Sequence, residues 1–475
     1  MAVVKAFVAF SSLSENSNLR LCYSNEKPQT THTLIKLFDC LESFETGSRP
    51  SGGIIYLDKD EDCALSLGGE QINADGSVDL KKMPLIPIDY FYTATRGKVQ
   101  QNDILVCKDG ALTGKSCYVS NNFPIKEVMV NEHVYILRGN GKINQKILFY
   151  LIQSQYVQAQ IKDLAYRKKG QPGLNTDHLS KIKIPTFDQP FQKKLLGSVL
   201  LLEQKILELK ESKLQIEQII NKVFTELLCF DWSEFKKIKS QKRFNATLVD
   251  FSKNVDCRLS YKFHNPAGQF IYDFLCSKTK KRIKNFILEP IVLGKSVSPS
   301  DYDDEGEFYY IAMSNIKTWA FGPEDCKKVS ENYSSSNPNK TVKKDDILLA
   351  RSGEGTIGKV ALIEDEDIQG IFADFTQRIR LKNYNPRLAY YYFRSDFFQY
   401  LVYTHKKGLG NNTNIFPSQI QEFPIPDWSE EKQAEIVEKI QTQIDAQSLI
   451  DREIEKNTAK INLIIEEAIR NPAYV

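Results

Sequence analysis

The sequence is poor in the residue patterns by which most enzymes hold a metal ion or a nucleophile. Its nine cysteines include no C-x-x-C pair, and its five histidines are scattered without an H-E-x-x-H motif. It also lacks G-x-S-x-G and the Asp-Pro-Pro-Tyr type of tetrapeptide with which amino-methyltransferases hold a flipped base. These absences favour binding or scaffolding over catalysis, and we expect neither metal ligands nor catalytic residues.

Long hydrophobic runs and a large excess of one charge are also missing. No window approaches the roughly 20 apolar residues of a membrane span, and the Val3–Phe10 run is too short for the apolar core of a signal peptide. An odd number of unclustered cysteines fits a reducing compartment, so we expect a cytoplasmic protein without membrane contact. The net charge of +3, from 63 basic and 60 acidic residues, leaves the partner open.

The chain is long enough for two to four domains, and near its middle is a regular apolar seam. Within Gln189–Leu228, apolar residues recur in steps of three and four, interrupted only near Lys213, as in a coiled-coil helix. The seam consists of Leu195, Val199, Leu202, Ile206, Leu209, Ile216, Ile220, Val223 and Leu227. This pattern predicts one long helix, roughly 50 Å from Leu195 to Leu227 at 1.5 Å per residue, that needs a partner helix.

Three strings recur in the same order with a period near 240 residues, which indicates an internal duplication. They are "RLCYSNEKP" and "RLSYKFHNP" (Arg20–Pro28, Arg258–Pro266), "DILVCKDGALTGK" and "DILLARSGEGTIGK" (Asp103–Lys115, Asp346–Lys359), and "IPTFDQPFQKKL" and "IPDWSEEKQAEI" (Ile184–Leu195, Ile425–Ile436). The same register places Ser429–Arg470 opposite the central helix, with a seam that is polar at Gln443, Gln447 and Asn457. The two helices are therefore candidate partners, although each could instead pack on its own globular half.

Short strand-like runs separated by turn residues, followed by a helical run, precede each long helix. In the first half the strands are expected at Gly53–Leu57, Asp103–Cys107, Ser116–Ser120 and Val134–Leu137, with a helix over Gln145–Leu164. In the second half they are expected at Asp346–Ala350, Lys359–Ile363 and Gln377–Leu381, with a helix over Arg387–Thr404. We predict an α+β protein with a first globular domain over residues 1–187, a central helix over 188–228, a second globular domain over 229–427 and a C-terminal helix over 428–475.

Two glycine-rich stretches imitate phosphate-binding motifs. Gly353–Val360 fits the G-x-G-x-x-G-x-V string, and Asp109–Ser116 misses a P-loop by one residue of spacing. A phosphate-binding turn must open a helix so that backbone N–H groups face the phosphate, whereas both stretches lead into strand-like sequence. We therefore interpret them as equivalent glycine-rich hairpins, and a nucleotide-using enzyme built on Gly353–Gly358 is the alternative.

Polar loops just before the strand that leads to each long helix are the best candidates for contacts with DNA. Arg, Lys, Asn and Gln are the side chains that bind base edges and phosphates, and glycine permits a close approach of the backbone. The alternative is that these are ordinary solvated loops. With the basic residues beside the glycine turns, the predicted DNA-binding residues are Lys108, Lys115, Arg167, Lys168, Lys169, Gln171, Asn175, Arg351, Lys359, Lys406, Lys407, Asn411, Asn412 and Asn414.

From about Leu19 onwards, the ordered and duplicated strings resemble the specificity subunit of Type I restriction–modification systems. Besides the hairpin strings, the resemblance depends on "FETGSRPSGG" (Phe44–Gly53), "VNEHVYILR" (Val130–Arg138), "LSKIKIP" (Leu179–Pro185), "FTQRIRL" (Phe375–Leu381) and "SQIQEFPIP" (Ser418–Pro426). It implies two target recognition domains, each recognising half of a split double-stranded DNA sequence. It also implies that the two long helices pair antiparallel, with pseudo-two-fold symmetry, as a spacer that docks methyltransferase subunits.

The resemblance further implies a non-catalytic chain that binds no cofactor itself. Two adenine methyltransferase subunits would use S-adenosylmethionine, and restriction subunits would use ATP and Mg²⁺ to translocate and cut DNA. The first half has "NEHV" (Asn131–Val134) where the second has "TQR" (Thr376–Arg378), so the two domains should recognise different half-sites. Another methyltransferase defence system without ATP-driven cleavage is the rival within this class, and a coiled-coil scaffold without a DNA role is a further alternative.

Overall fold

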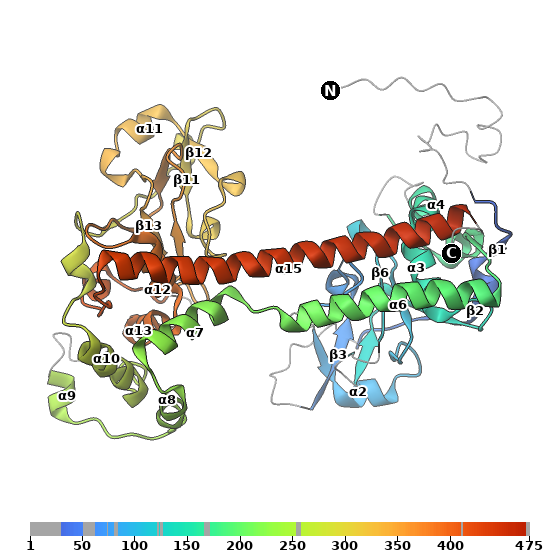
Figure 1. Cartoon of the computed structure of the whole chain (residues 1–475), viewed down its shortest axis with the longest axis horizontal. Helices are drawn as coiled ribbons and strands as arrows, with labels where there is room; N and C mark the ends of the chain where they lie inside the picture. Colours follow the sequence, from blue (N-terminus) through green and yellow to red (C-terminus); the bar gives the residue numbers. More distant parts are fainter. Residues whose placement is uncertain are drawn as a thin grey trace. The chain divides into compact units, whose positions relative to one another are not determined.

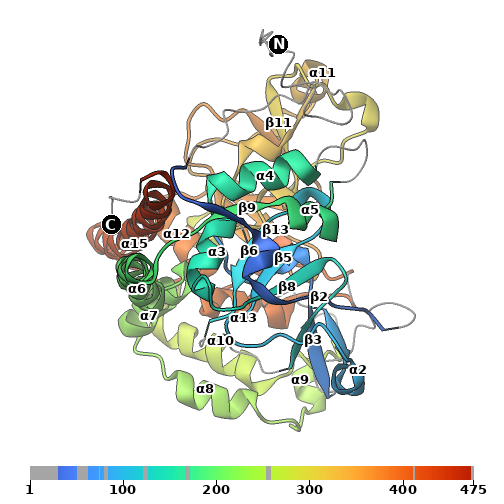
Figure 2. The same cartoon turned by 90° about the vertical axis from the view of Figure 1, so that its right-hand side faces the viewer.

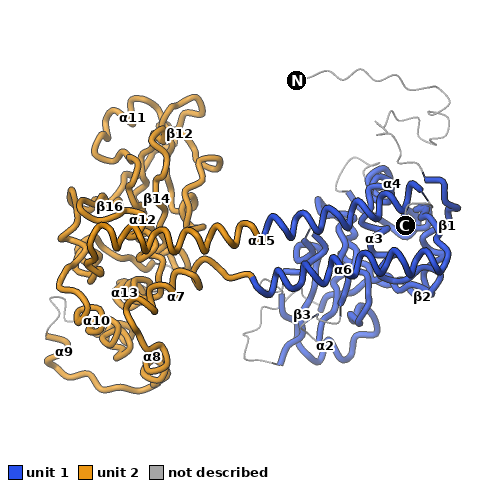
Figure 3. Tube along the Cα trace, in the orientation of Figure 1, with its two compact units in different colours: residues 1–212, 451–475 blue, residues 213–450 orange. Residues whose placement is uncertain are grey.

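The computed structural model describes residues 30–50, 62–73, 75–79, 84–120, 123, 127–165, 172–252, 258–409 and 412–471. The chain is a mixed α/β protein that divides into two compact units (Figure 3). Unit 1 comprises Met1–Ser212 and Asp451–Val475, and unit 2 comprises Lys213–Ile450. The expected strand at Gly53–Leu57 and the string at Arg20–Pro28 lie outside the described residues.

The described residues of unit 1 form two sheets in addition to the short pair β1 (Leu34–Lys36) and β9 (Lys183–Pro185). The four-stranded sheet is antiparallel, in the order β2 (Leu41–Thr46), β8 (Val134–Gly139), β5 (Ile104–Cys107), β6 (Ser116–Tyr118). The three-stranded sheet has the order β4 (Leu85–Pro87), β3 (Cys63–Leu67), β7 (Val128–Val130), and β3 and β7 run parallel.

Alternate residues of β5 enter two different cores, because successive strand side chains point to opposite faces of a sheet. Ile104 and Val106 pack with helices, whereas Leu105 packs with Leu67 of β3. The four-stranded sheet therefore has helices on one face and the smaller sheet on the other (Figure 2). The helical elements of unit 1 are η1 (Leu37–Cys40), η2 (Gly69–Gln71), α2 (Ile88–Thr93), η4 (Gly110–Leu112), α3 (Gln145–Gln153), α4 (Gln155–Ala165), α5 (Thr176–Lys181) and α6 (Gln189–Ser212).

Unit 2 has the same two kinds of sheet. The order of the four-stranded antiparallel sheet is β10 (Val292–Leu293), β16 (Thr376–Ile379), β13 (Ile347–Ala350), β14 (Val360–Leu362). The three-stranded sheet is β12 (Lys327–Val329), β11 (Phe308–Ile311), β15 (Gly370–Phe372), with β11 and β15 parallel. Strand β13 again divides its side chains between a helical core and a sheet core.

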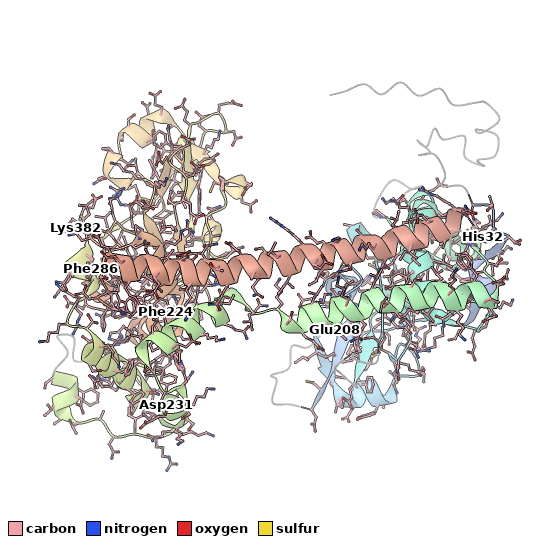
Figure 4. All side chains as sticks on the ribbon, viewed as in Figure 1. His32, Glu208, Phe224, Asp231, Phe286 and Lys382 are labelled. Carbon is pink, nitrogen blue, oxygen red and sulfur yellow. The ribbon has the colours of Figure 1, made fainter. Side chains whose placement is uncertain are left out.

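The helical elements of unit 2 form most of its larger core. Among the described residues they are α7 (Ile216–Leu228), α8 (Trp232–Lys239), α9 (Leu248–Ser252), α10 (Pro266–Lys278), η5 (Ile283–Phe286), η6 (Pro299–Asp301), η7 (Met313–Asn315), η8 (Pro323–Asp325), α11 (Glu331–Ser335), η9 (Pro338–Lys340), α12 (Pro386–Arg394), α13 (Asp396–His405), α14 (Pro417–Ile420) and the first half of α15 (Glu430–Arg470). The second half of α15, from Asp451, belongs to unit 1. Phe224 of α7, labelled in Figure 4, is fully buried 5.6 Å from the ring of Tyr392. No helix in the described parts of either unit is long and apolar enough to cross a membrane.

The two helices predicted before the polar loops are each divided by a serine. α3 ends and α4 begins around Ser154, whose hydroxyl accepts a hydrogen bond from the Val157 N–H and donates one to the Leu151 carbonyl. Ser395 separates α12 from α13, and its hydroxyl likewise donates to the carbonyl of Tyr392. A serine side chain that binds nearby backbone groups in this way favours a helix boundary over a helix interior.

The prediction of one continuous helix over Gln189–Leu228 is wrong. α6 ends at Ser212 and α7 begins at Ile216, so the break falls where Lys213 interrupts the apolar seam. Gln215 has extended backbone angles, and the non-helical Leu214 N–H donates to Gln447 Oε1 at 2.8 Å. A polar residue of the opposite seam therefore satisfies a backbone group that a continuous helix would have paired internally.

Each of the two shorter helices packs within its own unit against a different part of α15 (Figure 1). In unit 1, Leu195 and Val199 share a core with Ile461 and Ile465, and Lys205 Nζ lies 2.8 Å from Glu453 Oε1. In unit 2, the buried residues of α7 share a core with Ile436 and Ile440, and Lys439 Nζ lies 3.0 Å from Glu226 Oε2. The apolar seam therefore serves two kinds of contact: α6 and α7 each pack in the globular core of their own unit, and each also contacts α15.

A largely buried histidine makes the stability of unit 2 dependent on pH. Burial lowers the pKa of His405 to about 4, compared with about 6.5 in an unfolded chain. The unfolded state binds more protons between these values, so stability is complete above about pH 6.5 and falls as the pH drops towards 4, by up to about 3 kcal/mol.

The variant His405→Leu is expected to remove this pH dependence, because leucine does not titrate. The fold accepts leucine at this place, since unit 1 has the buried Leu164 near the end of α4 where unit 2 has His405 near the end of α13. Urea unfolding at pH 7.5 and pH 5, followed by tryptophan fluorescence, measures the effect. All three tryptophans, Trp232, Trp319 and Trp428, are in unit 2, so the signal is specific to it. An equal fall in stability in the parent and the variant would contradict the assignment.

Candidate nucleic-acid interface

The glycine-rich stretches are turns between antiparallel strands in both units. Gly353–Gly358 lies between β13 and β14, and the equivalent turn in unit 1 lies between β5 and β6. The three glycines Gly353, Gly355 and Gly358 have φ between 84° and 87°, the left-handed region that favours glycine. The hairpin interpretation is confirmed, and the geometry lacks the strand-to-helix turn on which a nucleotide-using enzyme would depend.

In unit 2 the polar loop that follows α13 packs directly against the glycine turn. Lys407 and Asn414 exchange two backbone hydrogen bonds of 2.7 Å, which closes the loop into a small hairpin. The loop then joins the turn, since the Gly353 N–H donates to the Thr413 carbonyl and the Ile415 N–H donates to the Arg351 carbonyl. Two segments that are about 60 residues apart in sequence thus form one surface.

Charges on this surface are partly paired. The Lys406 ammonium donates to both carboxylate oxygens of Glu354 at 2.8 and 3.0 Å, and its side chain is only 5% exposed. This hydrogen bond holds the pKa of Glu354 below its ordinary value. Arg351 donates from Nη2 to Asn414 Oδ1 at 3.3 Å, while its buried Nε has no protein partner among the described residues.

The same contact between turn and loop occurs in unit 1. The Gly110 N–H donates to the Pro172 carbonyl at 2.9 Å, and the Leu174 N–H donates to the Lys108 carbonyl at 2.7 Å. Gly114 packs so tightly on α4 that a Cβ there would lie 2.8 Å from the Cγ2 of Ile161. The close approach of the backbone explains why glycine is needed at this point.

The remaining predicted residues have varied surroundings. Lys108 Nζ lies 3.5 Å from the Glu132 carbonyl, Lys359 Nζ donates to the Lys317 carbonyl at 2.8 Å, and Asn175 caps α5 by accepting from the His178 N–H at 2.7 Å. Lys115 is partly buried and Asn412 is exposed at the loop tip. The others, Arg167, Lys168, Lys169, Gln171 and Asn411, lie outside the described residues.

Sequence reasoning missed several side chains beside the two turns. In unit 1 His133 Nδ1 lies 2.8 Å from Asp109 Oδ1, and Arg49 Nε lies 2.9 Å from Glu132 Oε1. In unit 2 the position equivalent to His133 is occupied by Phe375, which is 47% exposed. Its carbonyl accepts a hydrogen bond from the Arg351 N–H, as the His133 carbonyl does from the Lys108 N–H. The sequence signal that could have identified these side chains is the difference between the "NEHV" and "TQR" strings, because the side chains beside the glycine turns of the two units differ there.

Part of the chain matches a known family of DNA-specificity domains. Residues 281–458 match the sequence profile of the Type I restriction modification DNA specificity domain. No curated protein sequence matches the chain. The match includes β10 to β16, the turn Gly353–Gly358, the loop after α13 and much of α15.

Solved structures with similar chains were also found. One belongs to work on complex assembly and conformational transition of the type I R-M system (13% identity, 94% of this chain and 99% of that chain, TM-score 0.48). Another is a Type-I restriction-modification system S subunit from M. genitalium (13%, 94% and 98%, TM-score 0.40). A third is the HsdS subunit from Thermoanaerobacter tengcongensis (12%, 92% and 96%, TM-score 0.36). With TM-scores below 0.5, these similarities carry no weight beside the profile match.

Proposed function

We infer that the chain, whose residues 281–458 match the Type I restriction modification DNA specificity domain, is the DNA sequence-recognition subunit of a Type I restriction–modification system. The profile match is the observation that carries this conclusion. The matched residues include the turn and the loop of unit 2, the segments that the sequence predicts to contact DNA.

We propose that unit 1 is a second recognition domain, although the profile match lies outside most of it. The support is that both units have the same strand orders and the same backbone contact between a glycine turn and a polar loop. The duplicated strings are in the same order in both halves. Each unit would then recognise one half of a bipartite target, and the differences beside the turns would give the half-sites different sequences.

We propose that the side chains around each turn and loop make the DNA contacts. In unit 2, Arg351, Lys359, Lys407, Asn412 and Asn414 surround the joined turn and loop. The buried Lys406 is paired with Glu354 and is expected to hold the loop on the turn rather than to contact DNA directly. In unit 1, Lys108 and Lys115 have the equivalent places. Guanidinium and amide groups bind base edges, and ammonium groups bind phosphates.

The chemistry is proposed to reside in partner subunits. Two adenine methyltransferases that use S-adenosylmethionine would dock on equivalent surfaces of the two halves, and restriction subunits would supply ATP- and Mg²⁺-dependent cleavage. The contacts of α15 with α6 and with α7 support an antiparallel helical spacer between the half-sites. Two identical partners need two equivalent docking surfaces, which gives the duplication a physical reason.

Mapping of methylated adenines tests the proposal. A host without other modification systems would express the full chain with its methyltransferase, and its genome would be sequenced for N6-methyladenine. We expect one split motif with two different half-sites and a fixed gap. The same host with the methyltransferase alone is the control and should show no motif. An unsplit motif, or methylation that does not depend on this chain, would overturn the proposal.

A further inference from the structure

Trp319 has a backbone conformation that large side chains rarely adopt. Its φ is 66°, in the left-handed region, and it follows η7 in the connection from β11 to β12. Left-handed geometry brings the Cβ of an L-residue close to its own backbone, so a bulky residue there is an outlier that the surrounding structure must impose. Such strain occurs preferentially at functional positions.

Unit 1 has glycine at the equivalent place. Gly76 lies between β3 and β4 with φ 79°, and its N–H donates to the Asn73 carbonyl at 3.2 Å. The Trp319 N–H makes the same bond, also 3.2 Å, to the Ile316 carbonyl. The turn can therefore be made without strain, and unit 2 has a tryptophan where this fold accepts glycine.

The side chain of Trp319 connects a helix to the glycine turn. The Arg394 guanidinium lies 5.5 Å and the Lys359 ammonium 5.7 Å from the centre of its ring. Arg394, which is 7% exposed, also forms an ion pair of 2.8 Å with Glu217 of α7. Tyr390 donates to the Trp319 carbonyl and accepts from Arg394 at 2.6 Å. Ring and backbone are thus both fixed from the helical side.

The ring of Trp319 and the Lys317 carbonyl hold the ammonium of Lys359 beside the glycine turn. Lys359 follows Gly358 directly, its N–H donates to the Thr356 carbonyl within the turn, and its ammonium donates to the Lys317 carbonyl at 2.8 Å. An aromatic face attracts a cation, and the ammonium has three N–H donors, of which the Lys317 carbonyl uses one. The charge is held at the edge of the turn and can still bind an anion.

We propose that Trp319 is a positioning residue for DNA recognition by unit 2, fixing the Lys359 ammonium beside the Gly353–Gly358 turn so that it binds a backbone phosphate of the half-site. The proposal rests on the DNA-recognition function inferred above. The contacts of Tyr390 and Arg394 hold the strained conformation, and the ring that it presents orders Lys359, whereas Gly76 in unit 1 has no ring to do so.

A double-mutant cycle on DNA binding tests the proposal. The full chain, assembled with its methyltransferase, would be titrated with a duplex carrying the mapped target at several salt concentrations. We expect Trp319→Gly to weaken binding several-fold and to lower the slope of log K against log[salt] by about one, as the loss of one phosphate contact does. Lys359→Gln should do the same, and the double variant should be no weaker than either single variant.

Stability and matched variants separate positioning from a general structural role. Trp319→Gly relieves the backbone strain but removes the packing of the ring on the core of unit 2, so its binding is compared with that of the parent at a temperature where both are folded. Trp319→Phe, which keeps an aromatic ring, should recover much of the affinity. The control pair Trp319→Gly with Lys115→Gln of unit 1 should be additive. If the parent binds its target specifically but the losses of DNA affinity from Trp319→Gly and Lys359→Gln are additive, the positioning role is overturned and the DNA-recognition function stands. A parent without specific binding would overturn the function itself.

Discussion

Replacing Asp346 with alanine is expected to destabilise unit 2 by about 3–5 kcal/mol, the typical cost of removing one partner from a buried ion pair. Asp346 is fully buried, and its two carboxylate oxygens each lie 2.6 Å from a nitrogen of Arg380. The carboxylate also accepts from the Lys343 N–H at 2.7 Å, and it holds the pKa of Arg380 above its ordinary value. Alanine would leave the partly buried guanidinium of Arg380, 16% exposed, with Glu289 as its remaining carboxylate partner among the described residues.

Urea unfolding followed by tryptophan fluorescence measures this loss, because all three tryptophans are in unit 2. The matched variant is Asp103→Ala in unit 1, where Asp103 makes the same contacts with Arg138 at 2.7 and 2.9 Å and with the Gln100 N–H at 2.7 Å. It should lower the stability of unit 1, seen by circular dichroism, and leave the fluorescence transition in place. Asp346→Asn, which keeps an acceptor, should cost less than Asp346→Ala. A change below about 1 kcal/mol for Asp346→Ala would contradict the assignment.

Lengthening both helices of the proposed spacer is expected to widen the gap in the DNA target by about three base pairs. One heptad inserted after Lys205 in α6 and another after Glu453 in α15 would extend the two helices together, because these side chains lie 2.8 Å apart. Seven helical residues add about 10 Å at 1.5 Å per residue, and B-DNA rises 3.4 Å per base pair. Seven residues also preserve the period of both seams.

Methylation mapping of the variant gives the result directly as a new motif. Both half-sites should keep their sequences while the gap between them grows. The control is the same heptad inserted only at Lys213–Gln215, where the chain is not helical. Since α15 is unchanged in that control, the gap should stay as in the parent. A changed half-site in the double insertion would exclude the spacer role.

Much of the fold could be predicted from local signals. The strands next to the glycine turns were expected within one or two residues, because buried β-branched and leucine-rich runs bounded by Asp and Gly are strong strand signals. The divisions at Ser154 and Ser395 were not, since a single serine inside an apolar helical pattern is a weak signal until its hydroxyl is seen to bind the backbone. The break at Lys213 was visible only as a fault in the seam.

The candidate site was predicted as two separate segments, and the structure joins them. The sequence placed polar residues in the turn and in the loop, but the bonds from Gly353 to Thr413 and from Ile415 to Arg351 depend on the packing of α13 and β13. The ion pair of Lys406 with Glu354 and the ring of Trp319 beside Lys359 likewise join residues that are more than 35 positions apart. No local pattern specifies such pairs.

By itself the sequence determined the duplication of strings, the apolar seams and the absence of common catalytic motifs, because periodicity, order and motif spacing are properties of the chain. Only the tertiary structure decided that the central seam belongs to two helices and that each glycine turn is bonded to its polar loop. It also decided which charged side chains are paired. Those features depend on which backbone groups and charges remain unsatisfied after the cores have packed, and this is settled by contacts between residues far apart in the sequence.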